Sequence, residues 1–339
     1  MKSASFVEAT APARVDLAGG TLDLWPLHVL HPGSVTVNLA IDRRATCRVR
    51  RGEKGIRLVA PDRGIELRAD SAGELRADPR TALVAALVEE ICPDASVEVE
   101  FLSGVPFGSG LGGSSALAVA VAAALSQMNG KSLDGAGGVE LVRDVETRVL
   151  GKPAGVQDYH PAFAGALHCL WFETGRTVPE RLEVDPAEWD RHLTLFDTGS
   201  AHSSGMNNWE VFRRRLEGDA GVSRGLDSIA GAAREMAAAA RRKDFPAMGR
   251  ALDAEWQARR ELAPVVSSPA IERAIARARE AGAWGGKACG AGGGGCVVFL
   301  SPTDRTAAVR EALGTIEEGR VLPVRAEPRG LVCVASTEN

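Results

Sequence analysis

A glycine-rich segment runs from Pro106 to Ala116 and reads PFGSGLGGSSA. Residues 97–101 just before it alternate apolar and charged side chains, a period that predicts a half-buried strand. Residues 117–125 just after it are almost all Ala, Val and Leu, which predicts a buried helix. Glycines at such a junction let backbone N–H groups approach an anion, and the helix dipole favours negative charge there. The segment therefore predicts a site for the phosphates of a nucleotide.

This part of the sequence also resembles two other nucleotide-binding motifs. Its glycines have the G-x-G-x-x-G spacing of a dinucleotide-binding fold (Gly108, Gly110 and Gly113), with Asp134 roughly twenty residues on. That fold needs a strand ending at the acidic residue, whereas residues 130–135 read as a loop. A Walker motif ending at residues 130–132 fails because Leu125 stands where its first glycine is required. A purely structural turn stays open at this stage.

Composition limits the class of protein. The 339 residues suffice for two ordinary domains, and 25% charged with 45% hydrophobic residues is usual for a soluble chain. The formal net charge of -4 gives no electrostatic reason to expect nucleic acid or a membrane surface as a partner. The most uniform apolar run, residues 116–125, is about half of a membrane span. The N-terminus lacks a signal pattern, so we expect a cytoplasmic protein.

The six cysteines are widely scattered and form no C-x-x-C pair, which favours thiols in a reducing compartment over disulfides or a zinc site. Residues 174–190 are rich in Glu, Pro and Arg, and we place the edge of a first domain there. Beyond it the patterns predict two kinds of element: helices over 208–216, 226–242, 245–262, 269–281 and 304–313, and strands over 193–196, 296–300 and 331–335. With strand-like segments and helices in the first half as well, the sequence predicts an α+β protein in two parts.

A second glycine cluster lies at residues 287–296, KACGAGGGGC, directly before the apolar run 297–300. Five glycines among the six residues 290–295 lose much backbone entropy when they are ordered, and a simple hairpin needs only one or two. The cluster indicates backbone packed against a ligand, or a flap. A flexible connector is the other interpretation.

Two further segments carry candidate chemistry. Residues 14–23, RVDLAGGTLD, place charges beside a glycine turn, where Asp23 could accept hydrogen bonds from substrate hydroxyls or cap the turn. Asp158 follows a glycine at 155, and Glu146 lies on a predicted helix over 138–150. Taken alone, Asp158 is either a polar residue that stabilises a turn or a catalytic acid. Glu146 is either a solvated helix residue or a metal ligand.

Taken together, the four segments resemble one family, the GHMP kinases (galactokinase, homoserine kinase, mevalonate kinase and phosphomevalonate kinase). Residues 106–116 resemble its ATP-phosphate motif, Pro-x-x-x-Gly-Leu-Gly-Ser-Ser-Ala, and residues 287–296 its C-terminal motif, Gly-Ala-Gly-x-Gly-Gly. Residues 14–23 are similar to the N-terminal signature of galactokinase-like members. The resemblance implies an α+β, two-domain GHMP kinase fold. Its N-terminal domain, ribosomal protein S5 domain 2-like, would cover residues 1–185, and a ferredoxin-like C-terminal domain with extra helices residues 186–339.

The resemblance also implies site residues. The phosphates of ATP would be held by Pro106, Gly108, Ser109, Gly110, Leu111, Gly112, Gly113, Ser114 and Ser115. Mg²⁺ would be bound by Ser114 and Glu146, with Ser115 the alternative hydroxyl because Gly113 is inserted in the motif. Asp158 matches the acid that faces the acceptor hydroxyl, and Arg14 the basic residue beside it. The substrate-binding residues would be Asp16, Gly19, Gly20, Thr21, Asp23, Gly290, Ala291, Gly292 and Gly293.

The implied activity is phosphoryl transfer from Mg-ATP to a hydroxyl of a sugar or sugar phosphate, in a monomer or homodimer. Gly20-Thr21 stands where galactokinases have Glu-His, which favours the heptose-phosphate branch, although Leu22 separates Thr21 from Asp23. The polar segment 198–204 resembles one near the substrate, and Trp25 is interpreted as core rather than as a sugar-stacking residue. The alternatives are a mevalonate-type kinase, a diphosphomevalonate decarboxylase-like enzyme, or a nucleotide-binding sugar sensor.

Overall fold

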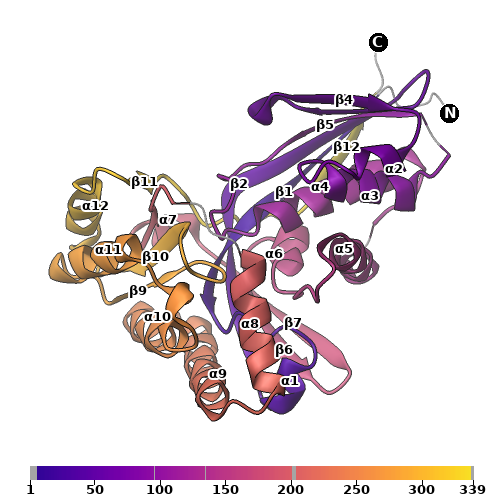
Figure 1. Ribbon diagram of the computed structural model, residues 1–339. Coiled ribbons are helices and arrows are strands. Elements are labelled where there is room, and N and C mark those ends of the chain that lie inside the picture. Colours follow the sequence, from indigo (N-terminus) through magenta and orange to yellow (C-terminus); the bar gives the residue numbers. More distant parts are fainter. Residues whose placement is uncertain (1–5, 95, 134, 201–203, 337–339) are drawn as a thin grey trace.

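The computed structural model describes residues 6–336 apart from 95, 134 and 201–203. Its larger sheet runs in the order β12-β1-β2-β5-β3-β4, and β6 and β7 extend it from β2 (Figure 1). These strands are β1 (Phe6–Ala18), β2 (Val35–Arg51), β3 (Ile56–Ala60), β4 (Ile65–Ala69), β5 (Val97–Leu102), β6 (Leu167–Glu173), β7 (Arg176–Leu182) and β12 (Val332–Ser336). The parallel β3–β5 pair is the exception among otherwise antiparallel pairs of this sheet.

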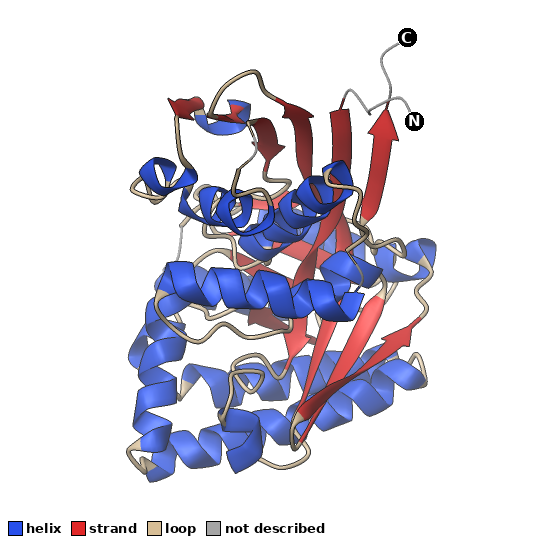
Figure 2. Cartoon of the chain, turned by 90° about the vertical axis from the view of Figure 1, so that its right-hand side faces the viewer, coloured by secondary structure: helices blue, strands red, loops and turns tan. Residues whose placement is uncertain are grey.

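Helices cover one face of this sheet (Figure 2). In chain order, the helices of the N-terminal half are α1 (Leu27–Leu30), α2 (Ala72–Leu75), α3 (Ala82–Ile91), α4 (Gly113–Met128), α5 (Gly135–Leu150) and α6 (Tyr159–Ala164), with a 3₁₀ turn at Pro61–Arg63; the short α7 (Pro186–Asp190) leads into the C-terminal half. The apolar α4 is the central one, because Ser115 through Ser126 are all buried and the helix packs on β1 and β2. The predicted strand before it is confirmed as β5, with Val97, Val99 and Phe101 facing the core.

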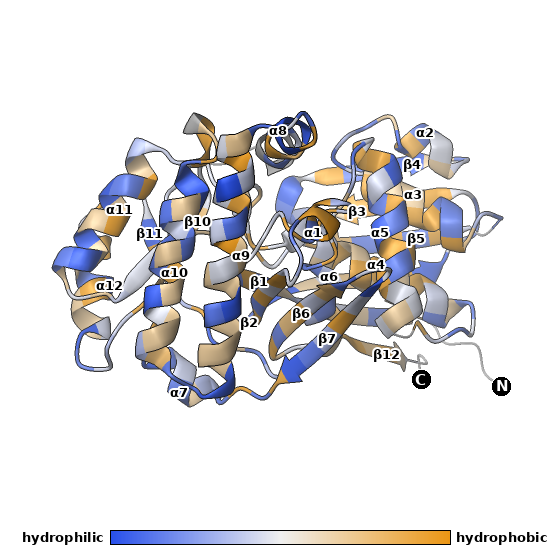
Figure 3. Cartoon of the chain, turned by 90° about the horizontal axis from the view of Figure 1, so that it is seen from below, coloured by the Kyte–Doolittle hydropathy of each residue, from blue (hydrophilic) through white to orange (hydrophobic). Residues whose placement is uncertain are grey.

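A smaller antiparallel sheet has the order β11-β8-β10-β9. It comprises β8 (Leu193–Asp197), β9 (Gly285–Ala288), β10 (Cys296–Leu300) and β11 (Arg320–Leu322). The helices of the C-terminal half, seen from below in Figure 3, are α8 (Ser204–Leu216), α9 (Ala220–Arg241), α10 (Phe245–Arg260), α11 (Pro269–Glu280) and α12 (Thr306–Gly314), with a 3₁₀ turn at Pro264–Val266. The helices α10, α11 and α12 contact the smaller sheet, whereas α9 packs on β1 and β2. Three of these helices have a side-chain cap at the N-terminus: Asp219 on α9, Asp244 on α10 and Ser268 on α11. Each cap accepts a hydrogen bond from the backbone N–H three residues further along the chain.

The two halves of the chain share buried surface. One apolar cluster combines the ends of β1 and β2 with α9, α10, β8 and β10. The last strand, β12, pairs with β1, so residues 332–336 lie on the N-terminal sheet although they follow the C-terminal half in sequence (Figure 1). Residues 174–190 hold a strand that the sequence analysis did not predict, β7. It is an edge strand paired only with β6, which explains its charged composition. None of the described helices combines the length and the apolar composition that a membrane-spanning helix requires.

Replacing Phe101 by Ala tests the assignment of the core face of β5. The Phe101 ring is 1% exposed, and we expect its loss to lower the free energy of unfolding by about 3–5 kcal/mol in urea denaturation. Leu102→Ala is the matched control. Leu102 is the next residue on the strand and is 37% exposed, so its replacement should lower the free energy of unfolding by less than about 1 kcal/mol. Equal losses for the two variants would contradict the assignment.

Candidate active site

The phosphate loop, residues 106–112, joins the region after β5 to the first turn of α4. Gly112 precedes the helix with a φ of 67°, a left-handed conformation that favours glycine. A Cβ there would lie 3.3 Å from Asp158 Oδ2 and 3.3 Å from Arg14 Cγ. The helix N-terminus, whose first backbone N–H groups have no partner within the helix, therefore lies in contact with the side chains of Asp158 and Arg14.

Arg14 connects three parts of the site. Its Nε donates to Asp158 Oδ1 at 2.8 Å, and its Nη2 lies 2.7 Å from the same oxygen. Its Nη1 donates to the carbonyl oxygen of Gly110 at 2.5 Å. Burial alone would lower the pKa of Arg14, but the carboxylates of Asp158 and Asp16 outweigh that effect and raise the pKa. Asp158 keeps 23% of its side chain exposed, so a substrate can reach it.

Glu146 on α5 faces the first turn of α4. Ser114 Oγ donates to one carboxylate oxygen at 3.2 Å, whereas Ser115 Oγ and the Tyr159 hydroxyl donate to the other at 3.1 and 2.5 Å. Burial is the main cause that raises the pKa of Glu146, and nearby Asp158 raises it further. A bound cation would relieve this cost.

The donor set fits Mg²⁺, which prefers oxygen ligands and keeps several waters and substrate phosphates around it. One carboxylate and the hydroxyls of Ser114 and Ser115 lie together at the phosphate loop. Among the described residues, no group of three or more His, Cys, Asp or Glu could form an all-protein metal cage. The described residues therefore offer a few oxygen ligands beside the phosphate loop and not a closed metal centre.

Asp23 lies against the segment that carries Asp158. The backbone N–H of Gln157 donates to Asp23 Oδ2 at 3.1 Å, and a Cβ on Gly155 would come within 1.8 Å of that oxygen, so only glycine fits there. Burial raises the pKa of Asp23 to about 6, and the negative charge of Asp158 adds to the shift. Gln157, which the sequence analysis did not single out, is also buried there, and no side-chain partner is found for its Oε1 within the described residues.

The second glycine cluster packs against the phosphate loop. A Cβ on Gly290 would lie 3.2 Å from the carbonyl oxygen of Gly110, and Cys296 N donates to Ser109 O at 2.8 Å. The two motifs, far apart in sequence, are thus neighbours. Ala291 is buried, and Gly292 and Gly293 both have positive φ and continue the same loop, in which Gly293 N donates to Val266 O at 2.6 Å.

The remaining predicted substrate residues lie at the base of the site. Gly19, Gly20 and Thr21 form the turn after β1 and are buried. Asp16 is fully buried, and Lys287 Nζ donates to its Oδ2 at 2.9 Å. Lys287 stands at the start of the second glycine cluster, and an isolated lysine before a glycine run carries no sequence signal of such a partner.

Two sequence interpretations concern the edges of the site. Trp25 is 70% exposed, so its interpretation as a core residue is wrong. It follows the buried Leu24 in the turn before α1, and its side chain lies at the surface. Of the polar segment 198–204, Thr198 N and Oγ1 both donate to Gly295 O, at 3.0 and 2.8 Å, which places Thr198 beside the second glycine cluster. Residues 201–203, and Asp134 of the dinucleotide alternative, lie outside the described residues.

Two family models match this chain, "GHMP kinases N terminal domain" over residues 80–166 and "GHMP kinases C terminal" over residues 236–316. The chain belongs to the GHMP kinases. The predictions of this family and of its α+β fold are confirmed. GHMP kinases use ATP and transfer its phosphoryl group to alcohols, so the predicted enzyme class is confirmed at the level of the family.

Known relatives of this GHMP kinase are similar over most of their length. It is 27% identical over 326 residues to D-glycero-alpha-D-manno-heptose 7-phosphate kinase of Campylobacter jejuni, covering 92% of this chain and 95% of that protein. It is 29% identical over 255 residues to galactokinase of Mycobacterium tuberculosis, covering 67% and 69% of the two chains. The fold is similar to that of Lactococcus lactis galactokinase complexed with galactose, with a TM-score of 0.81 at 18% identity, covering 97% of this chain and 95% of that one.

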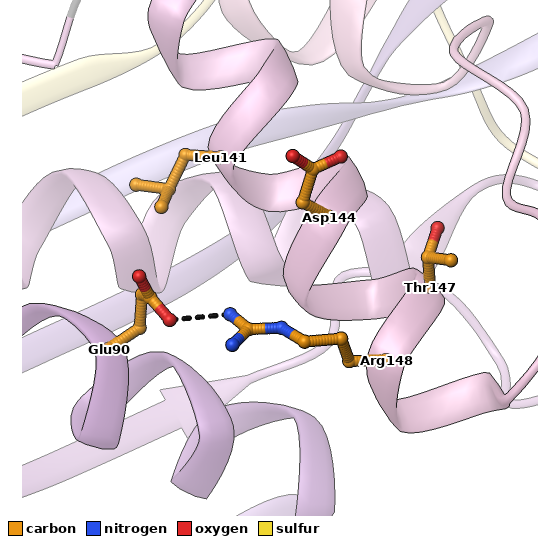
Figure 4. A pocket seen from close by; sticks show the side chains of 5 residues that line it. All are labelled: Glu90, Leu141, Asp144, Thr147 and Arg148. Atoms are coloured by element: carbon orange, nitrogen blue, oxygen red, sulfur yellow. Dashed lines mark hydrogen bonds and ion pairs between the residues drawn. The ribbon is translucent and has the colours of Figure 1, made fainter.

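A separate pocket of this GHMP kinase lies between α3 and α5 (Figure 4). Its lining includes Arg148, which donates to Glu90 at 2.5 Å, and Asp144. Asp144 and Arg148 each lie two residues from Glu146 in sequence. On a helix this spacing is a rotation of roughly 200° about the axis, so both side chains lie on the side opposite Glu146. This pocket therefore opens on the opposite side of α5 from the phosphate loop.

Replacing Asp23 by Asn tests the cost of its buried carboxylate. Because the folded pKa of about 6 exceeds the ordinary 3.8, the native protein binds more protons than the unfolded chain between these values, and stability falls as pH rises from about 4 to about 6. We expect the Asn variant to be more stable than wild type at pH 8, by up to about 3 kcal/mol, and similar at pH 4. Urea unfolding at both pH values measures this. Asp70→Asn, at an exposed side chain, is the control, and a gain for Asp23→Asn that is the same at both pH values would contradict the shift.

Proposed function

We propose that this GHMP kinase transfers the γ-phosphoryl group of Mg-ATP to a hydroxyl of a sugar or sugar phosphate, with Asp158 as the base. One observation carries the proposal. The Asp158 carboxylate, held by Arg14, lies in contact with Gly112 at the N-terminus of α4, where the phosphates are expected. A carboxylate placed there can meet the acceptor hydroxyl next to the transferred group.

In the proposed reaction, the acceptor oxygen attacks the γ-phosphorus while the bond from that phosphorus to the ADP oxygen breaks. The hydroxyl proton passes to Asp158. Backbone N–H groups of the phosphate loop and of the first turn of α4 neutralise charge on the phosphoryl oxygens. The guanidinium of Arg14, fixed on Gly110 O and Asp158, holds the carboxylate of the base in place and adds positive charge nearby.

Magnesium would be held by Ser114 and Glu146 beside the phosphates, with Ser115 as the alternative hydroxyl. When bound, it would offset negative charge on the triphosphate and orient it. The contacts that support this role are the hydrogen bonds of both serines to the Glu146 carboxylate. Tyr159, bonded to the same carboxylate and adjacent in sequence to Asp158, ties the proposed metal ligand to the segment of the base.

A polyol acceptor is supported by the groups beside Asp158. Asp23 is a buried hydrogen-bond acceptor, and the Gln157 amide offers a donor and an acceptor. Hydroxyls, which both donate and accept, suit such a pair. The named activities of the two relatives, heptose 7-phosphate kinase and galactokinase, point to the same substrate class.

Asp158→Asn tests the base. The amide preserves the shape of the side chain but cannot take the hydroxyl proton, so we expect kcat to fall about 100-fold or more. Binding of a non-hydrolysable ATP analogue, measured by calorimetry, should stay within about twofold. Asp144→Asn, an exposed acid on α5, is the control and should leave kcat unchanged. Near-normal turnover in Asp158→Asn would contradict the proposed role of Asp158 as the base.

Glu146→Gln tests the proposed metal ligand with Mn²⁺ as the probe. The neutral amide is a much weaker ligand, so we expect the affinity for Mn²⁺ in the presence of an ATP analogue to fall about tenfold or more, measured by electron paramagnetic resonance. Glu140→Gln changes an exposed acid on the same helix and should bind Mn²⁺ as wild type does. Unchanged Mn²⁺ affinity in Glu146→Gln would assign the metal to other groups.

A substrate panel tests the class of acceptor. Mg-ATP is supplied with free sugars, heptose phosphates, mevalonate and homoserine, and ADP formation is followed. We expect turnover with a sugar or a sugar phosphate. Turnover of mevalonate-type acids alone would overturn the proposed class, release of CO₂ from a diphosphate acid would indicate a decarboxylase, and binding without ADP formation would indicate a sensor.

A further inference from the structure

Four charged side chains meet beneath the site, where the two halves of the chain join. Asp16 lies on β1, Lys287 on β9, and Glu255 and Arg259 are one turn apart on α10. All four are buried. Lys287 Nζ lies 2.9 Å from Asp16 Oδ2 and 3.4 Å from Glu255 Oε1, and Arg259 Nη2 lies 2.6 Å from that same Glu255 oxygen. Two positive and two negative groups thus form one neutral cluster.

Such a cluster is a weak source of stability. Removing charges from water is costly, and well-packed apolar residues often replace buried ion pairs without loss. Burial alone would raise the pKa of Asp16 and lower that of Arg259, but the opposite charges around them reverse both shifts, so both groups stay ionised. The position of the cluster, rather than its contribution to stability, needs an explanation.

Arg259 extends the cluster into the turn after β1. Its Nη2 donates to the carbonyl oxygen of Gly20 at 2.7 Å, and its Nη1 donates to Thr21 Oγ1 at 3.2 Å. Thr21 Oγ1 in turn donates to Asn208 Oδ1 on α8 at 2.9 Å. Two helices of the C-terminal half therefore hold a turn of the N-terminal half.

The turn that they hold is strained. Thr21 has a φ of 78°, in the left-handed region that a β-branched residue rarely adopts. Such a conformation persists only where surrounding contacts impose it, and it is typical of functional sites. The contacts of Thr21 Oγ1 to Arg259 and Asn208 are of this kind.

The strained turn sets the position of the groups proposed to meet the acceptor. Asp23 is two residues from Thr21, and its carboxylate bonds to Gln157 N. A Cβ on Gly20 would lie 3.2 Å from Gln157 Nε2 and 2.7 Å from Asp16 Oδ2, so this backbone packs directly on both side chains. A shift at Gly20 or Thr21 would move Asp23 and Gln157 relative to Asp158.

We propose that Arg259 is a positioning residue for the acceptor side of the site: it holds Thr21 in its left-handed conformation and thereby fixes Asp23 and Gln157 for a polyol. The inference rests on the proposed function for the identity of the acceptor. It assigns to α10, a helix of the C-terminal half, control over substrate affinity without any contribution to the phosphate loop.

Arg259→Lys is the first test. Lysine keeps the charge beside Glu255 but cannot reach Gly20 and Thr21 with two N–H groups at once. We expect the KM for the sugar that the panel identifies to rise about tenfold, with the KM for ATP within about twofold. Arg260→Lys is the matched control, because the neighbouring arginine is partly exposed and bonds only to Glu272 in the described structure; neither KM should change.

Thr21→Gly in the Arg259→Lys background is the second test. Glycine adopts positive φ without strain, so it should restore most of the lost sugar affinity if Arg259 acts through the backbone of residue 21. A purely structural role of Arg259 predicts no such rescue. Should Arg259→Lys fail to fold, Thr21→Val replaces it, since it removes the shared hydroxyl without leaving a buried charge unpaired, and the same selective rise in the sugar KM is expected.

Hydrogen exchange separates this inference from the proposed function. Amides of residues 19–25 should exchange faster in Arg259→Lys than in wild type and Arg260→Lys, with no sugar present. Absence of sugar turnover in wild type would overturn the proposed function, but the exchange rates would still test the turn. Unchanged exchange in this segment, or equal rises in both KM values, would overturn the role of Arg259.

Discussion

The arrangement of the site depends on one buried guanidinium. Arg14, at the middle of β1, bonds to the carbonyl oxygen of Gly110 and to the carboxylate of Asp158, which is 144 residues away in sequence. A guanidinium taken out of water must find acceptors on several sides. Satisfying this one therefore brings the phosphate loop and the segment after α5 to the same place, and it holds the Asp158 carboxylate where a nucleotide is expected.

A second constraint on the site is the close approach of its backbone segments to neighbouring groups. Gly112 contacts Asp158, Gly155 contacts Asp23, and Gly290 contacts the phosphate loop, each at a distance that leaves little or no room for a side chain. The glycine-rich motifs thus do more than bend the chain. They let three segments from both halves of the protein approach each other closely, with the buried cluster of Asp16, Glu255, Arg259 and Lys287 beneath them. The acceptor side and the phosphate side of the site are held by different sets of contacts.

Much of the fold could be predicted from local patterns. Alternation predicted β5, and the Ala-rich run predicted α4, because one buried face or a fully buried helix leaves a clear periodicity. The edge strand β7 was missed, since its charged composition is typical of a linker. Trp25 was wrongly placed in the core, because large aromatic residues are usually buried and the sequence gives no sign of the exposed turn that carries it.

The sequence by itself determined the family, the order of its motifs and the residues proposed to handle phosphate, because glycine spacing and helix onset are local properties of the chain. Only the tertiary structure decided which charges pair. Glu255 and Arg259 look like solvated residues of an amphipathic helix, and Gln157 and Tyr159 like ordinary turn residues, until the fold buries them. Their roles follow from desolvation, which forces each buried polar group to find a partner, and those partners lie at sequence separations that no local pattern encodes.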